Sequence, residues 1–242
     1  MQCLVISDIH ANLAALEAVL EDTPDFDELW CLGDLVGYGP NPNECIDRIR
    51  GFTHTSLAGN HDWAALGKLS LRSFNAVARA ANEWTQQELT SSSRTYLNGL
   101  SPSLQQGDFA LAHGSPREPV WEYIMDANTA YRNFEYFSTP VCLVGHTHVP
   151  VLFKLDEEHD RAEAVLPPLP EPVGLGPERA IVNPGSVGQP RDGDPRASYA
   201  MLDTDEMTWE FRRVSYAIEI TQERMRAKAL PQLLIDRLDA GR

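Results

Sequence analysis

The chain has 242 residues, 43% of them hydrophobic, which is enough to bury one sizeable core. Its 20 lysines and arginines are outnumbered by 35 aspartates and glutamates; the net charge of −15 argues against a broad nucleic-acid-binding face, so a phosphorylated ligand must find a local positive charge. No apolar run approaches the roughly 18 residues of a membrane span, and the N-terminus lacks the pattern of a signal peptide, so we expect a cytoplasmic protein without membrane contact.

Strand-like and helix-like patterns alternate along the first part of the chain, and consecutive strands follow. In chain order, the first part predicts strand 3–7, helix 13–22, strand 28–34, helix 41–50, strand 54–60, helix 71–90, strand 109–114 and helix 126–137. The second part predicts strands 141–146, 151–156, 180–185, 198–203 and 208–214 and helix 217–229. This order favours an α/β fold with mixed sheets.

The domain organisation is simple. We expect a single domain over residues 1–242, because no internal repeat and no linker interrupts the pattern. Residues 156–179 are rich in proline and acidic side chains, which predicts an exposed loop between strands. The four cysteines lack CxxC spacing, and three of them lie inside apolar runs, so we interpret them as buried small hydrophobic residues.

Polar residues gather where predicted strands end. The stretches are SDIH (7–10), GD (33–34), GNHD (59–62), AHG (112–114) and GHTH (145–148). The carboxyl ends of parallel strands meet at one edge of a sheet, where ligands bind, and side chains two residues apart along a strand point to the same face. The sequence therefore predicts one convergent cluster of seven residues: Asp8, His10, Asp34, Asn60, His113, His146 and His148.

Carboxylates, imidazoles and one amide, without a thiolate, form a ligand set that suits Mn, Fe, Zn, Ni or Co. Seven ligands exceed one ordinary site and fit two ions roughly 3.5–4 Å apart with a bridging carboxylate. Two divalent ions and two carboxylates leave a net charge of about +2, which attracts phosphate and lowers the pKa of a bridging water toward about 7. A bridging hydroxide is then the nucleophile. The sequence contains no GxxxxGK[ST], GxSxG or HExxH motif that would indicate a competing chemistry.

These motifs resemble those of the calcineurin-like metallophosphoesterases, and NPGSVG (183–188) resembles the closing loop of that family. The compact form is most similar to the bacterial and archaeal phosphodiesterase branch, which is related to diadenosine tetraphosphatase. The resemblance implies two mixed β-sheets packed face to face and flanked by helices. It also implies a cofactor of two divalent transition-metal ions.

Residue roles follow from the same resemblance. One ion would be held by Asp8, His10 and His148. The other would be held by Asn60, His113 and His146, with Asp34 bridging the two. His61 would act near the leaving-group oxygen, either as general acid or by stabilising the oxyanions of the transition state.

One departure concerns the stretch GDLVGYG (33–39). Gly37 and Tyr38 replace the Asp and Arg that phosphoprotein phosphatases carry in G-D-x-x-D-R-G, so the partner that orients His61 is unknown and a smaller substrate is favoured. Arg191 is a candidate replacement contact for phosphate, with a solvated turn arginine as the alternative. Asn12 could also reach phosphate at a helix N-terminus, with simple helix capping as the alternative.

Residues 121–137 hold six of the twenty aromatic residues of the chain, which favours either core packing or a base-stacking surface. The predicted helix 71–90 either covers the cleft or only packs on the body. The function we expect is hydrolysis of a small phosphorylated substrate, a phosphodiester or nucleoside polyphosphate. The alternatives are a phosphomonoesterase, a Ser/Thr phosphoprotein phosphatase, and a non-catalytic scaffold with the same fold.

Overall fold

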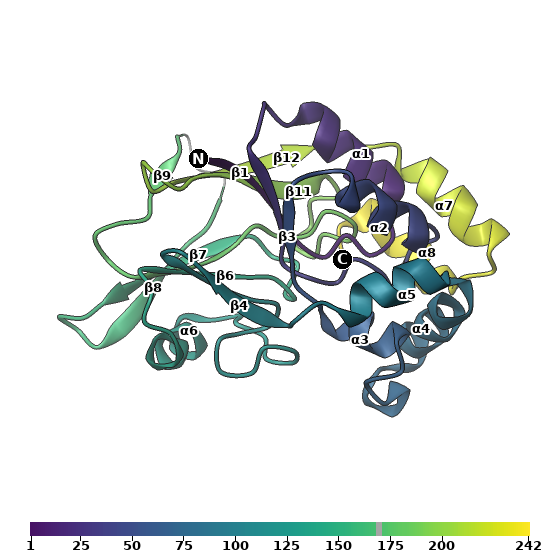
Figure 1. The fold of residues 1–242 in the computed structure, drawn as a ribbon, viewed down its shortest axis with the longest axis horizontal. Coiled ribbons are helices and arrows are strands. Elements are labelled where there is room, and N and C mark those ends of the chain that lie inside the picture. The colour runs from purple at the N-terminus through teal and green to yellow at the C-terminus, as the bar shows by residue number, and fades with distance from the viewer. Residues whose placement is uncertain (168–170) are drawn as a thin grey trace.

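Two mixed β-sheets form the centre of the protein (Figure 1), whose computed structural model describes residues 1–167 and 171–242. Within the described residues, the first sheet has the order β3 (His54–Ser56), β2 (Glu28–Cys31), β1 (Gln2–Ile6), β11 (Ala197–Asp203), β12 (Thr208–Val214) and β9 (Val173–Gly174). The second has the order β4 (Ser103–Gln106), β5 (Phe109–Ala112), β6 (Val141–Val144), β10 (Ala180–Asn183), β7 (Val151–Asp156) and β8 (Arg161–Val165).

Each sheet contains three neighbouring parallel strands. In the first sheet β1 pairs in parallel with β2, and β2 with β3. In the second sheet β6 pairs in parallel with β5 and with β10. The remaining pairs are antiparallel. The predicted functional residues therefore follow the carboxyl ends of parallel strands in both sheets.

Alternation along the strands explains the layers. In β1, Cys3 and Val5 pack between the two sheets, whereas Leu4 and Ile6 pack on the opposite face beneath helices. The inner layer includes Trp30 from the first sheet. A separate cluster on the outer face of the second sheet joins Phe153 to the helical segment near residue 130. The result is a helix–sheet–sheet–helix arrangement, which confirms the predicted fold class.

Eight α-helices surround the sheets in the described residues: α1 (Leu13–Asp22), α2 (Pro42–Arg50), α3 (Asn60–Ala65), α4 (Ala76–Glu88), α5 (Ser91–Asn98), α6 (Ala127–Asn133), α7 (Ile218–Ala227) and α8 (Gln232–Ala240). Short 3-10 helices span Leu71–Ser73 and Phe134–Tyr136. Figure 1 shows α6 below the second sheet, and α1, α2, α7 and α8 together at the other end. None of the helices in the described residues has the length and hydrophobicity needed to span a membrane.

Several predicted boundaries are wrong. The predicted strand 54–60 ends at Ser56, and Asn60 begins α3, because the Asp62 carboxylate accepts a hydrogen bond from the Gly59 N–H at 2.8 Å and caps a helix there. The predicted helix 71–90 is a 3-10 turn followed by α4, since the Asn75 side chain caps a new helix at that point. The predicted helix 126–137 ends its α-helical part at Asn133.

The predicted exposed loop over 156–179 is also wrong in part. Strand β8 pairs with β7, and the short β9 pairs with β12, so tertiary pairing overrides the acidic, proline-rich composition. Residues 168–170 of this stretch lie outside the described residues. The sequence also did not predict β4, α5 or α8. The four cysteines are buried and unpaired, as expected.

Candidate metal centre and active site

The structure brings all seven predicted ligands together at the carboxyl ends of the parallel strands. Asp8 and His10 follow β1, Asp34 follows β2, and Asn60 is the first residue of α3 after β3. The three histidines follow the strands of the second sheet: His113 comes after β5, and His146 and His148 come after β6. Each of the seven side chains is buried. The cluster thus lies where the two sheets meet.

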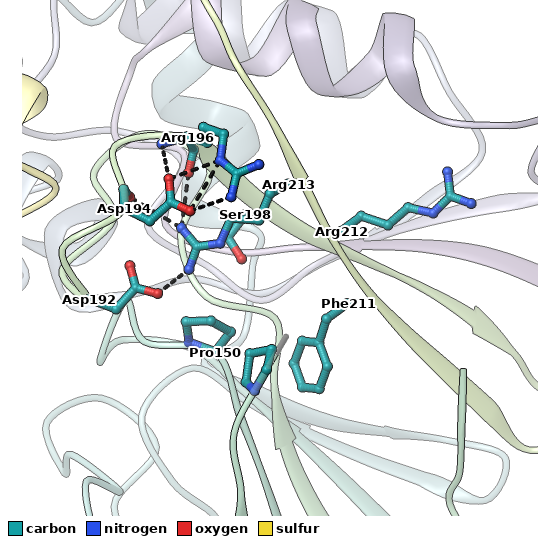
Figure 2. Close-up of a pocket in the computed structure, with 9 residues that line it drawn as sticks. Pro150, Asp192, Asp194, Arg196, Ser198, Phe211, Arg212 and Arg213 are labelled. Atoms are coloured by element: carbon teal, nitrogen blue, oxygen red, sulfur yellow. Dashed lines mark hydrogen bonds and ion pairs between the residues drawn. The ribbon is translucent and has the colours of Figure 1, made fainter. Parts of the chain in front are cut away.

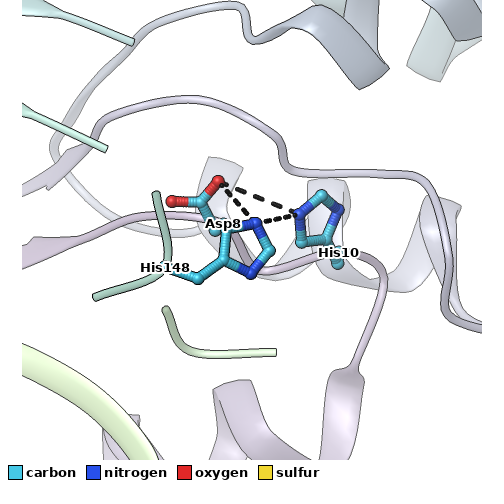
Figure 3. Close-up of side chains that lie close together, drawn as sticks. All are labelled: Asp8, His10 and His148. Atoms are coloured by element: carbon cyan, nitrogen blue, oxygen red, sulfur yellow. Dashed lines mark hydrogen bonds and ion pairs between the residues drawn. The ribbon is translucent and has the colours of Figure 1, made fainter. Parts of the chain in front are cut away.

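The first group consists of Asp8, His10 and His148, whose side chains point toward one another in Figure 3. Asp8 Oδ1 lies 3.3 Å from His148 Nε2 and 3.8 Å from His10 Nε2. The two Nε2 atoms are 3.0 Å apart. The other oxygen of Asp8 accepts hydrogen bonds from Ser7 Oγ at 2.7 Å and from the His146 N–H at 3.0 Å. Oδ1 is therefore the atom left for a ligand.

Backbone carbonyl groups bind Nδ1 of three of the four histidines predicted as ligands. His10 Nδ1 donates to Val36 O at 3.1 Å, His113 Nδ1 to Leu32 O at 2.8 Å, and His148 Nδ1 to Gln189 O at 2.5 Å. A histidine whose Nδ1 carries the proton presents the lone pair of Nε2, as metal-ligating histidines do. The two lone pairs of His10 and His148 at 3.0 Å repel each other unless a cation lies between them.

The second group consists of Asp34, His113 and His146. His113 Nε2 lies 3.4 Å from Asp34 Oδ2 and 3.2 Å from Asn60 Oδ1, so the amide belongs to this group as well. Asp34 Oδ2 is also 3.7 Å from His10 Nε2 of the first group. One carboxylate oxygen thus faces both groups. Its partner Oδ1 accepts a hydrogen bond from the His61 N–H at 2.8 Å.

A glycine makes this position of Asp34 possible. A Cβ at Gly59 would approach Asp34 Oδ1 to 2.0 Å, closer than any side chain can tolerate. The glycine of the GNHD motif is therefore required by the close approach of the backbone to the carboxylate.

Two buried polar atoms of the cluster have no hydrogen-bond partner in the described residues: Asp8 Oδ1 and His146 Nε2. A buried polar atom without a partner is costly. One such atom belongs to each group, and each has the chemistry of a ligand for a divalent transition metal. The donor set therefore fits two sites for such ions.

Burial favours the neutral form of most of these histidines, which is the form that binds a metal ion. Burial lowers the pKa of His10 well below its usual range, and burial lowers the pKa of His146 to about 3. His113 differs: burial opposes its charge, but the Asp34 carboxylate outweighs burial and raises the pKa of His113 to about 9. The Asp34 carboxylate therefore stabilises a positive charge in the second group, here the protonated ring of His113.

The backbone of the cluster is strained. Asp8, His10, Asp34, His146 and His148 all have positive φ, between 48° and 65°. Non-glycine residues rarely adopt this region, and each costs on the order of 1–3 kcal/mol. Five of the seven predicted ligands share this conformation, so the surrounding structure holds them against their local preference. Such strain is typical of functional sites.

His61 lies beside the cluster and is buried. Its ring lies 5.0 Å from that of His10 and 4.3 Å from that of Tyr38. Burial lowers the pKa of His61 to about 4. Its Nδ1 contacts the side chain of Asn82 on α4 at 3.1–3.2 Å. Within the predicted helix 71–90, α4 therefore reaches the site through Asn82.

The two predicted phosphate contacts differ. Arg191 is half-buried, its Nη2 donates to Gln189 Oε1 at 3.0 Å, and its Nε has no partner among the described residues. Asn12 uses all of its polar capacity inside the protein: its Oδ1 accepts from Ala15 N and Thr221 Oγ1, and its Nδ2 donates to Gly188 O and Tyr216. These contacts favour the capping role for Asn12, whereas Arg191 retains a free donor.

The aromatic stretch 121–137 divides between the two uses considered for it. Phe134 is buried in the core, whereas Trp121 and Tyr123 are 37% and 46% exposed. The Tyr123 ring stacks on His146 at 3.9 Å, and Trp121 packs on Phe74, whose ring lies 5.2 Å from that of His61. The sequence did not single out Tyr123, Trp121 or Asn82, because only the fold shows which aromatic and amide side chains face the cluster.

A cavity of about 270 Å³ lies elsewhere and is lined by residues including Pro150, Asp192, Asp194, Arg196 and Arg213 (Figure 2). No predicted ligand lines it. Arg196 pairs with Asp194, and Arg213 pairs with Asp192. Arg212, which also lines the cavity, pairs with Glu210. Each arginine that lines the cavity therefore has a carboxylate partner.

Known proteins are similar to this chain in sequence, and one solved structure is similar in fold as well. A metallophosphoesterase from Sphaerobacter thermophilus, known from its crystal structure, is 49% identical and superposes with a TM-score of 0.92 over 100% of this chain and 99% of that one. An uncharacterized protein of Methanocaldococcus jannaschii is 36% identical over 98% of this chain and 97% of its own length. Phosphodiesterase YfcE of Escherichia coli K12 is 27% identical over 86% of this chain and 90% of its own length.

The family model of the calcineurin-like phosphoesterase superfamily domain matches residues 1–207. The resemblance predicted from five short motifs is thereby confirmed, as are the predicted fold and the assignment to hydrolases that act on ester bonds. Two groups of potential metal ligands agree with the metal dependence of that family. The chain belongs to the calcineurin-like phosphoesterase superfamily.

Proposed function

We propose that the chain is a binuclear hydrolase of phosphodiesters or nucleoside polyphosphates. In this proposal Asp8, His10 and His148 hold one divalent ion, and Asn60, His113 and His146 hold the other. The observation that supports it best is the position of Asp34, whose Oδ2 lies 3.7 Å from His10 Nε2 and 3.4 Å from His113 Nε2. When bound, two such ions supply an activated water and neutralise the negative charge of phosphate.

The residues of the chain complete the site. His61 lies next to the proposed bridging residue, because its backbone N–H binds Asp34 Oδ1, and its Nε2 makes no hydrogen bond within the described residues. In the proposal this nitrogen donates to the leaving-group oxygen. Arg191, which is half-buried and has no carboxylate partner within the described residues, binds a phosphoryl oxygen through its guanidinium group.

The surroundings favour a small substrate with an aromatic part. The chain carries a net charge of −15, so a long polyanion is repelled outside the cluster. Trp121 and Tyr123 are exposed aromatic residues that contact Phe74 and His146, respectively, at the border of the cluster. A nucleobase can stack on such a surface. A nucleoside-containing phosphodiester or polyphosphate satisfies both conditions.

The experiment is a substrate panel with the purified protein and added Mn²⁺. Bis(p-nitrophenyl) phosphate, p-nitrophenyl phosphate, cyclic nucleotides, dinucleoside polyphosphates and a phosphopeptide are compared by kcat/KM. We expect the diesters or the polyphosphates to be the best substrates. A preference for the monoester or the phosphopeptide would contradict the proposed substrate class. Metal analysis should find about two ions per chain, and one ion at full activity would contradict the binuclear site.

A further inference from the structure

The imidazole of His61 lies between two segments that are far apart in the sequence. On one side is the backbone of Gly37, where an added Cβ would approach His61 Nδ1 to 2.6 Å. On the other side is α4, whose Asn82 contacts the same nitrogen. No side chain fits at position 37 without displacing the ring. Within the described residues, the hydrogen-bond partner of His61 Nδ1 is therefore Asn82 of α4.

Asn82 is an unusual residue for its place. It lies in the middle of α4, is fully buried, and shares its helix face with Ala78 and Ala81. Asparagine is a poor helix former, and a buried amide is costly unless its hydrogen bonds are made. Its Nδ2 donates to Ala78 O at 3.0 Å, and the remaining capacity of the amide faces His61. A leucine would pack on this face at lower cost, so the amide indicates a role toward His61.

The amide presents both of its ends to His61. Asn82 Oδ1 lies 3.2 Å, and Asn82 Nδ2 3.1 Å, from His61 Nδ1. The oxygen can accept a hydrogen bond when Nδ1 carries a proton, and the nitrogen can donate one when it does not. A carboxylate at this place could only accept. Asn82 therefore holds the ring in one orientation in either tautomer.

We propose that Asn82 is the positioning residue of His61: by binding Nδ1 it fixes the ring so that Nε2 is presented to the leaving group. This inference rests on the proposed function and names the partner that orients His61, which the sequence did not reveal. Asn82 acts only through His61 and does not touch the substrate. Phe74, whose ring meets His61 at 5.2 Å, supports the same orientation from the residue preceding the cap of α4.

The test compares two diesters that differ in the leaving group, bis(p-nitrophenyl) phosphate and diphenyl phosphate. Phenolate is the poorer leaving group, so it depends more on a positioned donor. We expect Asn82→Leu to lower kcat for diphenyl phosphate about 10- to 100-fold, with a smaller loss for the nitrophenyl ester and KM within about twofold. Asn82→Asp, which keeps an acceptor for Nδ1–H, should recover part of this loss.

A double-substitution cycle separates positioning from a structural role. In a His61→Ala background, adding Asn82→Leu should leave kcat unchanged, because the residue through which Asn82 acts is gone. A further loss in that background, or equal losses for both diesters, would overturn the inference. Bound Mn²⁺ and the thermal unfolding midpoint are measured for each variant. If Asn82→Leu does not fold, Asn82→Ala replaces it in the same cycle.

A readout without turnover keeps this inference distinct from the proposed function. In protein with ¹⁵N-labelled histidine, the Nδ1 resonance of His61 should shift in Asn82→Leu, while those of the exposed His159 should not. An unchanged His61 resonance would overturn the positioning role. A wild-type protein that hydrolyses none of the diesters or polyphosphates would instead overturn the proposed function.

Discussion

Arg191 and the arginines of the cavity in Figure 2 come from the same part of the chain but have opposite surroundings. In the cavity, Arg196 and Arg213 each pair with an aspartate, and Arg212 pairs with Glu210. Arg191 has no carboxylate partner within the described residues; it donates to an amide oxygen and leaves Nε unpaired beside the ligand cluster. A cation that the protein does not neutralise is available to an external anion.

The same contrast holds for carboxylates. Asp192 and Asp194 are paired with arginines, whereas within the described residues Asp8 Oδ1 has no hydrogen-bond partner and Asp34 Oδ2 lies near Nε2 of two histidines of the cluster. A buried polar group without a partner requires an explanation, and for the two atoms of the ligand cluster a bound ion is the explanation that fits their chemistry. The cavity in Figure 2 therefore differs from the ligand cluster, because the charged side chains that line it already have partners.

Replacing the proposed bridge should have the largest effect. Asp34→Asn is expected to lower kcat more than about 10²-fold and to reduce the bound Mn²⁺, because the shared charge is lost while the shape is kept. Activity and metal content are measured together. Asp192→Asn, which removes a paired carboxylate of the cavity, serves as the control and should keep both. Full activity of Asp34→Asn would contradict the difference in function between Asp34 and the paired carboxylates of the cavity.

The second largest effect concerns Arg191, compared with an arginine that is paired with an aspartate. Arg191→Ala should lower kcat/KM for phosphodiesters about 10- to 100-fold, the value of a charge-assisted hydrogen bond to phosphate. Arg196→Ala should change kcat/KM less than about twofold, because its side chain is exposed and paired with Asp194. Steady-state kinetics on both variants decide the matter. Equal effects of the two substitutions would show that the missing partner of Arg191 has no functional meaning.

Metal affinity should depend on pH through His113. In the metal-free protein the Asp34 carboxylate raises the pKa of His113 to about 9, and a metal ligand must lose that proton. Mn²⁺ affinity should therefore rise about tenfold per pH unit from pH 7 to 9 and level off above, as measured by calorimetry with about one proton released. In Asp34→Asn the dependence should move to lower pH. No release of protons from wild type would contradict this linkage.

The smallest effect concerns the exposed aromatic border. Trp121→Ala should raise KM for thymidine 5′-p-nitrophenyl phosphate about tenfold, since stacking of one base is worth about 1–3 kcal/mol. Methyl p-nitrophenyl phosphate, which has no base, should be affected less. Tyr136→Ala is the matched control, because Tyr136 is 54% exposed and its ring contacts Arg117 instead of the cluster. Equal losses for both esters would remove the stacking role.

The sequence determined the family and the members of the cluster, because each predicted ligand lies in a short motif next to a strand and the ends of parallel strands meet at a fixed edge. It did not determine the exact boundaries, since the helix that begins at Asn60 and the strands β8 and β9 depend on capping and pairing with distant segments. Nor did it reveal the partner of His61.

Only the tertiary structure decided which polar groups remain unsatisfied. Arg191 and Arg213 look alike in the sequence, and so do Asn12, which caps α1, and Asn82, which lies inside α4. Their partners come from segments up to 209 residues away, as for the bond between Asn12 and Thr221. The local sequence determines the hydrophobic periodicity and the residue types of each motif. Whether a charged or polar side chain finds a partner depends on packing between remote parts of the chain.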